Sequence, residues 1–92
     1  MRVATAISTK LTEALAPVRL DVVDDSCRHA GHVGARPEGE THFRVEVVSM
    51  RFEGLDRLAR QRLVYRILAA EIESHVHALE LSTMTPDEDA AR

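Results

Sequence analysis

Hydrophobic positions follow a helical period in two stretches of the chain. From Val3 to Leu15, apolar residues recur at three- and four-residue spacing, and polar residues fill the other side. This pattern predicts an amphipathic helix that ends before Pro17, because the residue preceding a proline avoids helical geometry. The second stretch, residues 58–74, has an apolar arc opposite a basic side and predicts the most regular helix of the chain.

Three other segments have the β-prone runs or alternating faces that are typical of β-strands. They are residues 18–24, 41–49 and 76–84. In the second of them, one face is expected to be buried around Phe43 and the other to be wetter. In the third, His77 is expected to share a face with Leu79 and Leu81.

The element order α-β-β-α-β predicts an α+β fold. The first two strands can pair antiparallel, and a right-handed strand–helix–strand crossover joins parallel neighbours. The expected architecture is a three-stranded mixed sheet with the helices packed on one face. Residues 1–86 are expected to form this single domain, and residues 87–92 a polar tail. The final segment, TPDEDAAR, is acidic and is expected to fray.

A long loop separates the first two predicted strands. Residues 25–40 contain glycine, proline and serine and show no periodicity. A loop of sixteen residues is uncommon inside a compact domain, and such loops tend to be functional or disordered.

The composition restricts the class of protein. The 92 residues, 10.2 kDa, suffice for one small domain, and no apolar run approaches the ~18 residues that a membrane helix needs. The N-terminal segment lacks the apolar core of a signal peptide, so the protein is expected in the cytoplasm. Cys27 is the one cysteine, which excludes an internal disulfide. The net charge of -3 argues against binding nucleic acid mainly through phosphates.

Five histidines are the main chemical signal of this short chain. His29 and His32 stand in the long loop, where a neutral imidazole can either bind a metal or stay solvated. His42 opens the second strand, off its buried face. His75 is explained by the favourable position of a cation at a helix C-terminus. His77 lacks such an explanation, and it is either a ligand or a buried histidine that bonds to a backbone carbonyl.

The number of sulfur donors restricts the metal chemistry. A [2Fe–2S] cluster takes four protein ligands, usually thiolates, with two histidines replacing two cysteines in Rieske-type sites. A chain with one thiol cannot hold such a cluster with cysteines by itself. It could supply one or two histidines to a site that a partner's thiolates complete. Zinc bound by two or three histidines is the competing interpretation.

No motif for catalysis stands out. The chain lacks a glycine-rich phosphate loop and the CxxC, HExxH and GxSxG motifs. Cys27, beside Arg28 and His29, could be a reactive thiol, with an incidental loop cysteine as the alternative. One thiol without a resolving cysteine does not favour a redox enzyme.

The second predicted helix raises the alternative of nucleic-acid binding. It carries Arg60, Arg62 and Arg66, which could contact DNA. Acidic residues flank this helix, and no aromatic platform for stacking bases is present. A solvated face or a surface for an acidic protein is therefore favoured over DNA.

Four segments together resemble the BolA family. The resemblance runs from about residue 7 to residue 86, and its matching segments read LDVVDDSCRHAGH, GETHFRVEVVS, RFEGLDRLARQRLVYRIL and VHALELSTMTP. The most specific features are the strand ETHFRVEVVS, the F-x-G and R-x-R-x-V-Y spacing, and the terminal VHAL. The chain departs from the family pattern at Gln61, where many relatives have histidine, and in its longer AGHVGARPEGE loop.

The resemblance implies a non-enzymatic role and a fold similar to the class II KH domain. It implies partnership with monothiol glutaredoxins, in heterodimers that share a glutathione-dependent [2Fe–2S] cluster. The isolated chain is then expected to hold no cofactor and to be a monomer or weak homodimer. In that family the histidine of the VHAL-type segment is the constant ligand, which maps onto His77. The second ligand comes from the loop between the first two strands and maps onto His29, with His32 as competitor. These histidines can converge only if the third strand runs parallel to the second.

The family also carries a transcription-regulator interpretation, in which Arg60, Arg62 and Arg66 would contact DNA. The GxxG loop that typical KH domains use to hold nucleic acid is missing, and fold similarity alone does not establish that function. Salt separates the two hypotheses, because DNA binding weakens steeply with salt whereas cluster sharing depends on thiol and iron supply.

Overall fold

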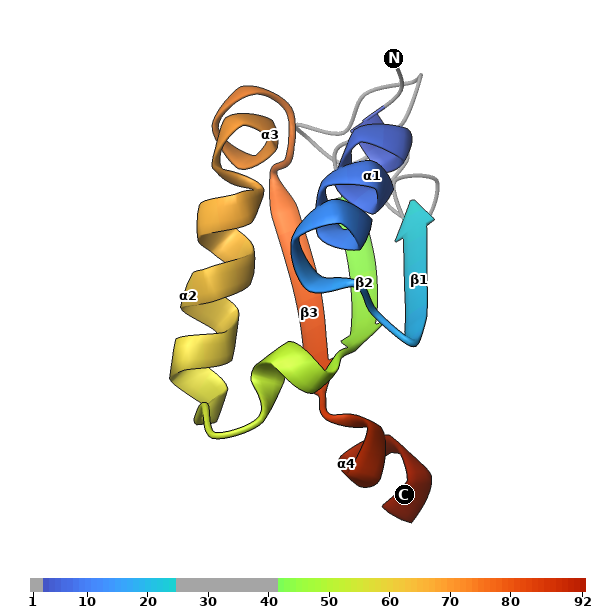
Figure 1. Cartoon of the computed structure of the whole chain (residues 1–92). Helices are drawn as coiled ribbons and strands as arrows, with labels where there is room; N and C mark the ends of the chain where they lie inside the picture. Colours follow the sequence, from blue (N-terminus) through green and yellow to red (C-terminus); the bar gives the residue numbers. More distant parts are fainter. Residues whose placement is uncertain (1–2, 25–41) are drawn as a thin grey trace.

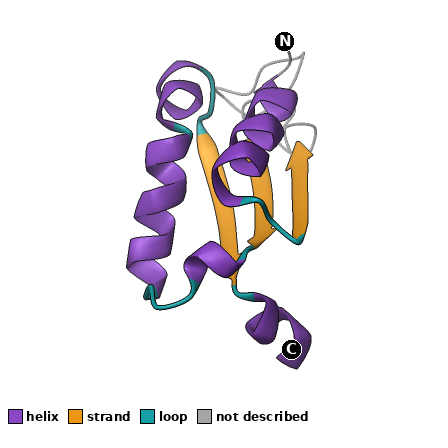
Figure 2. Ribbon diagram, viewed as in Figure 1, coloured by secondary structure: helices purple, strands orange, loops and turns teal. Residues whose placement is uncertain are grey.

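The computed structural model describes residues 3–24 and 42–92. The elements, in chain order, are α1 (Val3–Leu15), β1 (Arg19–Asp24), β2 (His42–Val48), the 3-10 helix η2 (Met50–Phe52), α2 (Arg57–Ile67), α3 (Ala69–Ser74), β3 (Ala78–Met84) and α4 (Pro86–Ala91). The three strands form one sheet in the order β1-β2-β3, antiparallel between β1 and β2 and parallel between β2 and β3 (Figure 1). Helices α1 and α2 lie on the same face of the sheet (Figure 2). The predicted α+β fold with a mixed sheet is confirmed.

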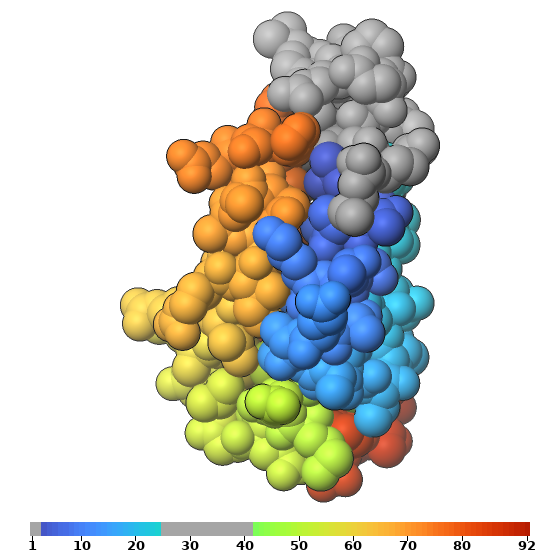
Figure 3. Space-filling view, turned by 45° about the horizontal axis from the view of Figure 1, so that its top comes forward, coloured from blue at the N-terminus to red at the C-terminus, as the bar shows by residue number. Residues whose placement is uncertain are grey.

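The hydrophobic core lies between the sheet and the helices. Strand β2 is central, and its alternate residues Phe43, Val45 and Val47 are buried on the helix side, as their spacing predicted. Helix α1 buries the predicted stripe, and α1 and the α2–α3 segment lie side by side over the core (Figure 3). The other buried members of this core are Ile7, Leu11, Leu15, Phe52, Val64, Leu68 and Val76.

The second predicted helix is interrupted. Helix α2 ends before Leu68 and α3 begins after it, because Leu68 adopts φ -98° and ψ 14°. The Leu68 side chain is fully buried, its N–H donates to Val64 and its carbonyl accepts from Ile72. The chain therefore changes direction at a residue anchored in the core (Figure 1). The prediction of one continuous helix over residues 58–74 is therefore wrong. Apolar periodicity does not reveal that the helix axis changes direction at one buried residue.

The last residues form a helix, so the prediction of a frayed tail is wrong. Thr85 is the N-cap of α4: its hydroxyl accepts from the Glu88 N–H, and the Glu88 carboxylate accepts from the Thr85 N–H. Pro86 stands at the start of the helix, where its missing N–H costs nothing. The sequence TPDE is thus a capping box, which outweighs the polarity of the segment.

Two arginines hold α4 to the rest of the chain. Arg60 of α2 donates to both carboxylate oxygens of Glu88, at 2.6 and 3.3 Å. Arg19 of β1 lies between Glu46 of β2 and Asp89 of α4, at 2.7 Å from each. Hydrogen bonds from Arg19 lower the pKa of Glu46 and of Asp89, and the hydrogen bond from Arg60 lowers the pKa of Glu88 to about 2.

Acidification is therefore expected to destabilise the chain through α4. A carboxylate whose pKa is lower in the folded chain adds stability above its unfolded pKa, and that stability is lost as the pH falls through the folded value. For Glu88 this window runs from 4.5 down to about 2. Urea unfolding across the window should show a falling free energy of unfolding, and Arg60→Gln should flatten the fall. Arg62→Gln is the matched control on the same helix; equal flattening by both variants would exclude the Arg60–Glu88 pair as the cause.

Within residues 3–24 and 42–92, no helix combines the length and the apolar character that crossing a bilayer requires. The cytoplasmic location stays a prediction.

Candidate metal-ligand site

Two histidines meet where the parallel strands β2 and β3 begin. His42 is the first residue of β2, and its partner in the register is Ala78, the first residue of β3. His77 directly precedes Ala78, so the parallel pairing brings the two imidazoles together. Their ring centroids are 6.1 Å apart, and the rings make an angle of 77°. Residues that are 35 positions apart in the sequence thus form one imidazole pair.

The side chain of His42 lies on the sheet face opposite the helices. The next residue, Phe43, is buried in the core on the helix side, and successive side chains of a strand point to opposite faces. His42 is half-buried. The expectation that His42 lies off the buried face is confirmed, although sequence analysis did not place it among the ligands.

The side chain of His77 is exposed, and two interpretations of its surroundings are wrong. It is not a buried core histidine, and it does not share the half-buried face of Leu79 and Leu81. The reason is that β3 begins only at Ala78. Val76, the residue before His77, is buried and donates its N–H to the Glu71 carbonyl of α3, so the strand alternation does not extend back to His77.

His75 is placed by the end of α3. It is the C-cap of that helix, and its backbone N–H donates to Glu71. This position agrees with the explanation from the helix C-terminus, where a cation is favoured. Since His75 and His77 do not lie on one strand, they are not a pair of ligands on one face.

The imidazole pair offers two nitrogen donors for a metal. Neutral histidine is a common ligand for zinc, copper and iron, but none of these sites is complete with two donors. Within residues 3–24 and 42–92, no group of three or more histidine, cysteine or carboxylate side chains is arranged to hold a metal ion. The loop candidates His29 and His32, like Cys27, lie outside the described residues. The parallel pairing of β2 and β3, which the shared histidine site requires, is confirmed.

The three arginines proposed for DNA are not equivalent. Arg60 is engaged: besides Glu88, it donates to the Leu55 carbonyl at 2.8 Å, and its guanidinium lies 5.9 Å from the centre of the Phe52 ring. Arg62 and Arg66 are exposed, and within the described part of the chain they form no ion pair. Only these two of the three are available to a phosphate backbone.

Comparison with known proteins shows which family the chain resembles. The family model described as BolA-like protein matches residues 11–88. The chain is 51% identical over 84 residues to human BolA-like protein 1, which covers 91% of this chain and 58% of the relative. It is 42% identical over 91 residues to Protein BOLA1, chloroplastic, of Arabidopsis thaliana, covering 97% of this chain and 57% of the relative. The solved structure of BolA1 from Arabidopsis thaliana is similar with a TM-score of 0.83, at 39% identity and 96% coverage of both chains.

The chain spans a little over half the length of these two curated relatives. The likeness is therefore established for the shared domain, in both its sequence and its fold.

Proposed function

The chain belongs to the BolA-like family, and on that premise we propose that it is a non-enzymatic adaptor that shares a [2Fe–2S] cluster with a monothiol glutaredoxin. In this proposal the chain provides histidine ligands to one iron. The partner and its glutathione provide the thiolates. The function would be the trafficking of the cluster or the sensing of iron.

The observation that carries the proposal is the His42–His77 pair. Two histidines on one iron are the donor set of Rieske-type clusters, and here two imidazoles from neighbouring strand ends stand 6.1 Å apart between ring centroids. His77 is exposed, so a partner's cluster can approach it, and His42 is half-buried beside it. The residues present thus fit half of the ligand set of such a cluster, with His77 as the first ligand. His42 competes with His29 and His32 for the second place.

The missing donors explain why a partner is needed. The described residues contain no cysteine and the whole chain has one, so at least one of the two thiolates of such a cluster must come from outside this chain. When bound, the cluster would supply one-electron redox chemistry with a potential that histidine ligands raise. Imidazoles must be neutral to bind iron, so mildly acidic pH would favour release of the cluster. This property suits a carrier or a sensor better than a permanent redox centre.

The DNA-binding alternative has less support. Arg62 and Arg66 remain exposed on α2, but Arg60 is already held by Glu88 and by the Leu55 carbonyl. The net charge of -3 also opposes strong phosphate binding. We therefore propose cluster sharing as the main function and keep DNA contact as the competitor that a salt titration tests.

Reconstitution tests the proposal and the second ligand together. The chain is mixed anaerobically with a monothiol glutaredoxin, glutathione, iron and sulfide, and visible absorption and circular dichroism are recorded. The mixture should give a cluster spectrum different from that of glutaredoxin with glutathione alone, whereas the chain purified by itself in air should be colourless. His42→Ala should lower the fraction of mixed cluster, because one of the two adjacent imidazoles is lost.

The His75→Ala variant is the matched control, since His75 is exposed at the end of α3 and has a separate structural explanation. If His42→Ala leaves the spectrum unchanged while His29→Ala or His32→Ala alters it, the second ligand lies in the loop. A chain that never changes the glutaredoxin spectrum, or one that is brown by itself, would refute the proposed sharing.

A further inference from the structure

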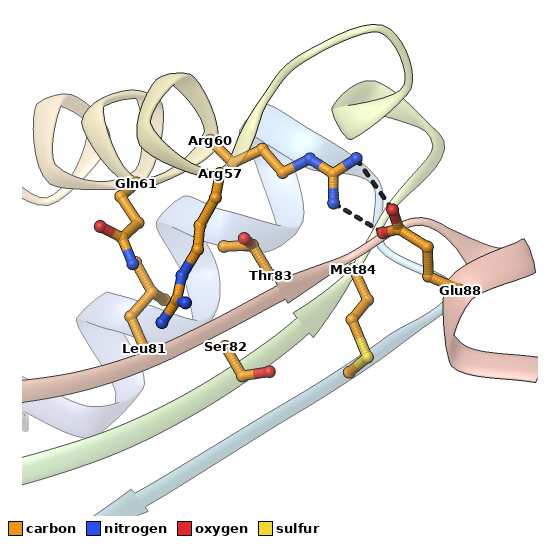
Figure 4. A pocket seen from close by; sticks show the side chains of 8 residues that line it. All are labelled: Arg57, Arg60, Gln61, Leu81, Ser82, Thr83, Met84 and Glu88. Atoms are coloured by element: carbon orange, nitrogen blue, oxygen red, sulfur yellow. Dashed lines mark hydrogen bonds and ion pairs between the residues drawn. The ribbon is translucent and has the colours of Figure 1, made fainter. Parts of the chain in front are cut away.

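A groove runs between the start of α2 and the end of β3, at the opposite end of β3 from His77. Its volume is about 430 Å³, within the range of sites that bind ligands. Four consecutive residues of β3, Leu81 to Met84, line it together with side chains of α2 (Figure 4). Successive residues of a strand point to opposite faces, so a groove that touches all four runs along the edge of the strand.

The edge of β3 that borders this groove has free backbone groups. β3 is the last strand of the sheet, and within the described ranges no other strand pairs with its outer side. The Met84 carbonyl accepts from the Ser49 N–H at 2.9 Å and so points toward the β2 side. Backbone groups alternate in direction along a strand, hence Leu81 and Thr83 present their N–H and carbonyl groups outward. An unpaired edge of this kind is a template for an added strand.

Two arginines of α2 line the groove and differ in their partners. Arg60 is neutralised by Glu88 at one end (Figure 4). Arg57 extends with Gln61 toward Leu81, and it forms no ion pair within the described part of the chain. Arg57 also begins α2 directly after the N-cap Asp56, whose carboxylate accepts from the Ala59 N–H and forms no ion pair with Arg57 within the described residues. A cation at a helix N-terminus is unfavourable, so the position of Arg57 is not explained by the stability of the helix.

We propose that this groove binds an extended acidic peptide segment of another protein, which adds to β3 as a further strand and places a carboxylate against Arg57. The outward groups of Leu81 and Thr83 would supply main-chain hydrogen bonds, which give affinity without demanding a sequence. Arg57 would supply the charge-assisted bond that selects an acidic side chain, with Gln61 as a second donor. Addition of an extended peptide to an exposed sheet edge is an established mode of peptide recognition.

The same groove suits single-stranded nucleic acid less well. It offers one unpaired guanidinium, and none of its lining residues is aromatic, whereas proteins that bind single strands combine a basic track with stacking platforms. The extended backbone of a peptide, in contrast, matches the row of free strand groups. The observations therefore favour a polypeptide.

The test uses the whole chain and a fluorescein-labelled peptide, Thr-Glu-Val-Glu-Val-Thr, with a version carrying lysine for glutamate as the charge control. Fluorescence anisotropy should show binding of the acidic peptide, and amide chemical shifts should change at Leu81 and Thr83. Arg57→Gln should weaken binding about tenfold or more, the effect of losing one charge-assisted hydrogen bond. The same substitution should not lower the melting temperature, because it removes an unfavourable cation from the helix start.

Arg62→Gln is the matched control, because Arg62 is an exposed arginine of the same helix that does not line the groove. Thr83→Pro gives an independent test, since proline is tolerated at an edge strand where the N–H faces outward, and it should also abolish binding. If Arg57→Gln and Arg62→Gln weakened peptide binding equally, the effect would come from the overall charge of the chain and not from the groove, and the proposal would be overturned. No binding of the acidic peptide, or Arg57-dependent binding of oligothymidine alone, would overturn it as well.

Discussion

The His77→Ala variant is expected to lose the mixed cluster spectrum completely while keeping the thermal stability of the parent chain. The imidazole of His77 is exposed, so its removal leaves no cavity and no unsatisfied buried group. The backbone at this position is fixed by the buried Val76 on one side and by β3 on the other, so little backbone entropy is lost when the ring binds iron. His29→Ala should do less damage, because His32 stands three residues away and can replace it.

Two measurements on the same samples distinguish a ligand from a structural residue. Circular dichroism of the reconstituted mixture reports the cluster, and a thermal melt of the free variant reports the fold. His75→Ala, two residues away and also exposed, should change neither. If His77→Ala kept the cluster spectrum and melted at a lower temperature, His77 would be structural, and the main residue of the proposed function would be lost.

The fold could be predicted where burial follows a simple period. The stripe of α1 from Ile7 to Leu15 and the alternation of β2 around Val45 are both found as expected, because each element buries one face against the same core. The order of elements then leaves few ways to connect them, since the crossover through α2 and α3 requires β3 to lie parallel to β2.

The structure differs from the predicted elements where a local interaction outweighs the periodic pattern of apolar residues. Leu68 bends the second helix, and the capping box of Thr85 and Glu88 forms α4 from a segment whose polarity suggested a tail. The capping box could have been found in the sequence, since a threonine followed three residues later by a glutamate is its signature. The bend at Leu68 could not, because no glycine or proline marks it.

The candidate site could be predicted only in part. The sequence indicates His77 as a candidate ligand. Its exposure, however, depends on the residue at which β3 begins, and the alternation of apolar and polar residues does not fix that start to within one residue. The proximity of His42 to His77 cannot be predicted from the sequence for a different reason. His42 lies beside His77 because of its register with Ala78, and the long helical crossover between β2 and β3 does not fix that register to one residue.

The largest loss of stability is expected from Phe52→Ala, at about 3–5 kcal/mol. The Phe52 ring is fully buried in the core and stands in η2, the short segment that leads from β2 to α2. It also lies beneath the guanidinium of Arg60, which connects α2 to α4 through Glu88. Small domains have about 5–15 kcal/mol of total stability, so this one change removes a large share of it. Urea unfolding at neutral pH measures the effect.

Two further variants show whether the cost comes from the buried ring of Phe52. Phe52→Leu keeps most of the buried volume and should cost much less than Phe52→Ala. Tyr65→Ala removes an aromatic ring that is 42% exposed on α2, and it should change the free energy of unfolding by about 0.5 kcal/mol or less. Phe52→Ala should also flatten the acid dependence described for Glu88, because Arg60 loses the ring that supports it. If Phe52→Ala and Tyr65→Ala were equally mild, Phe52 would not anchor the connection between the sheet and α2.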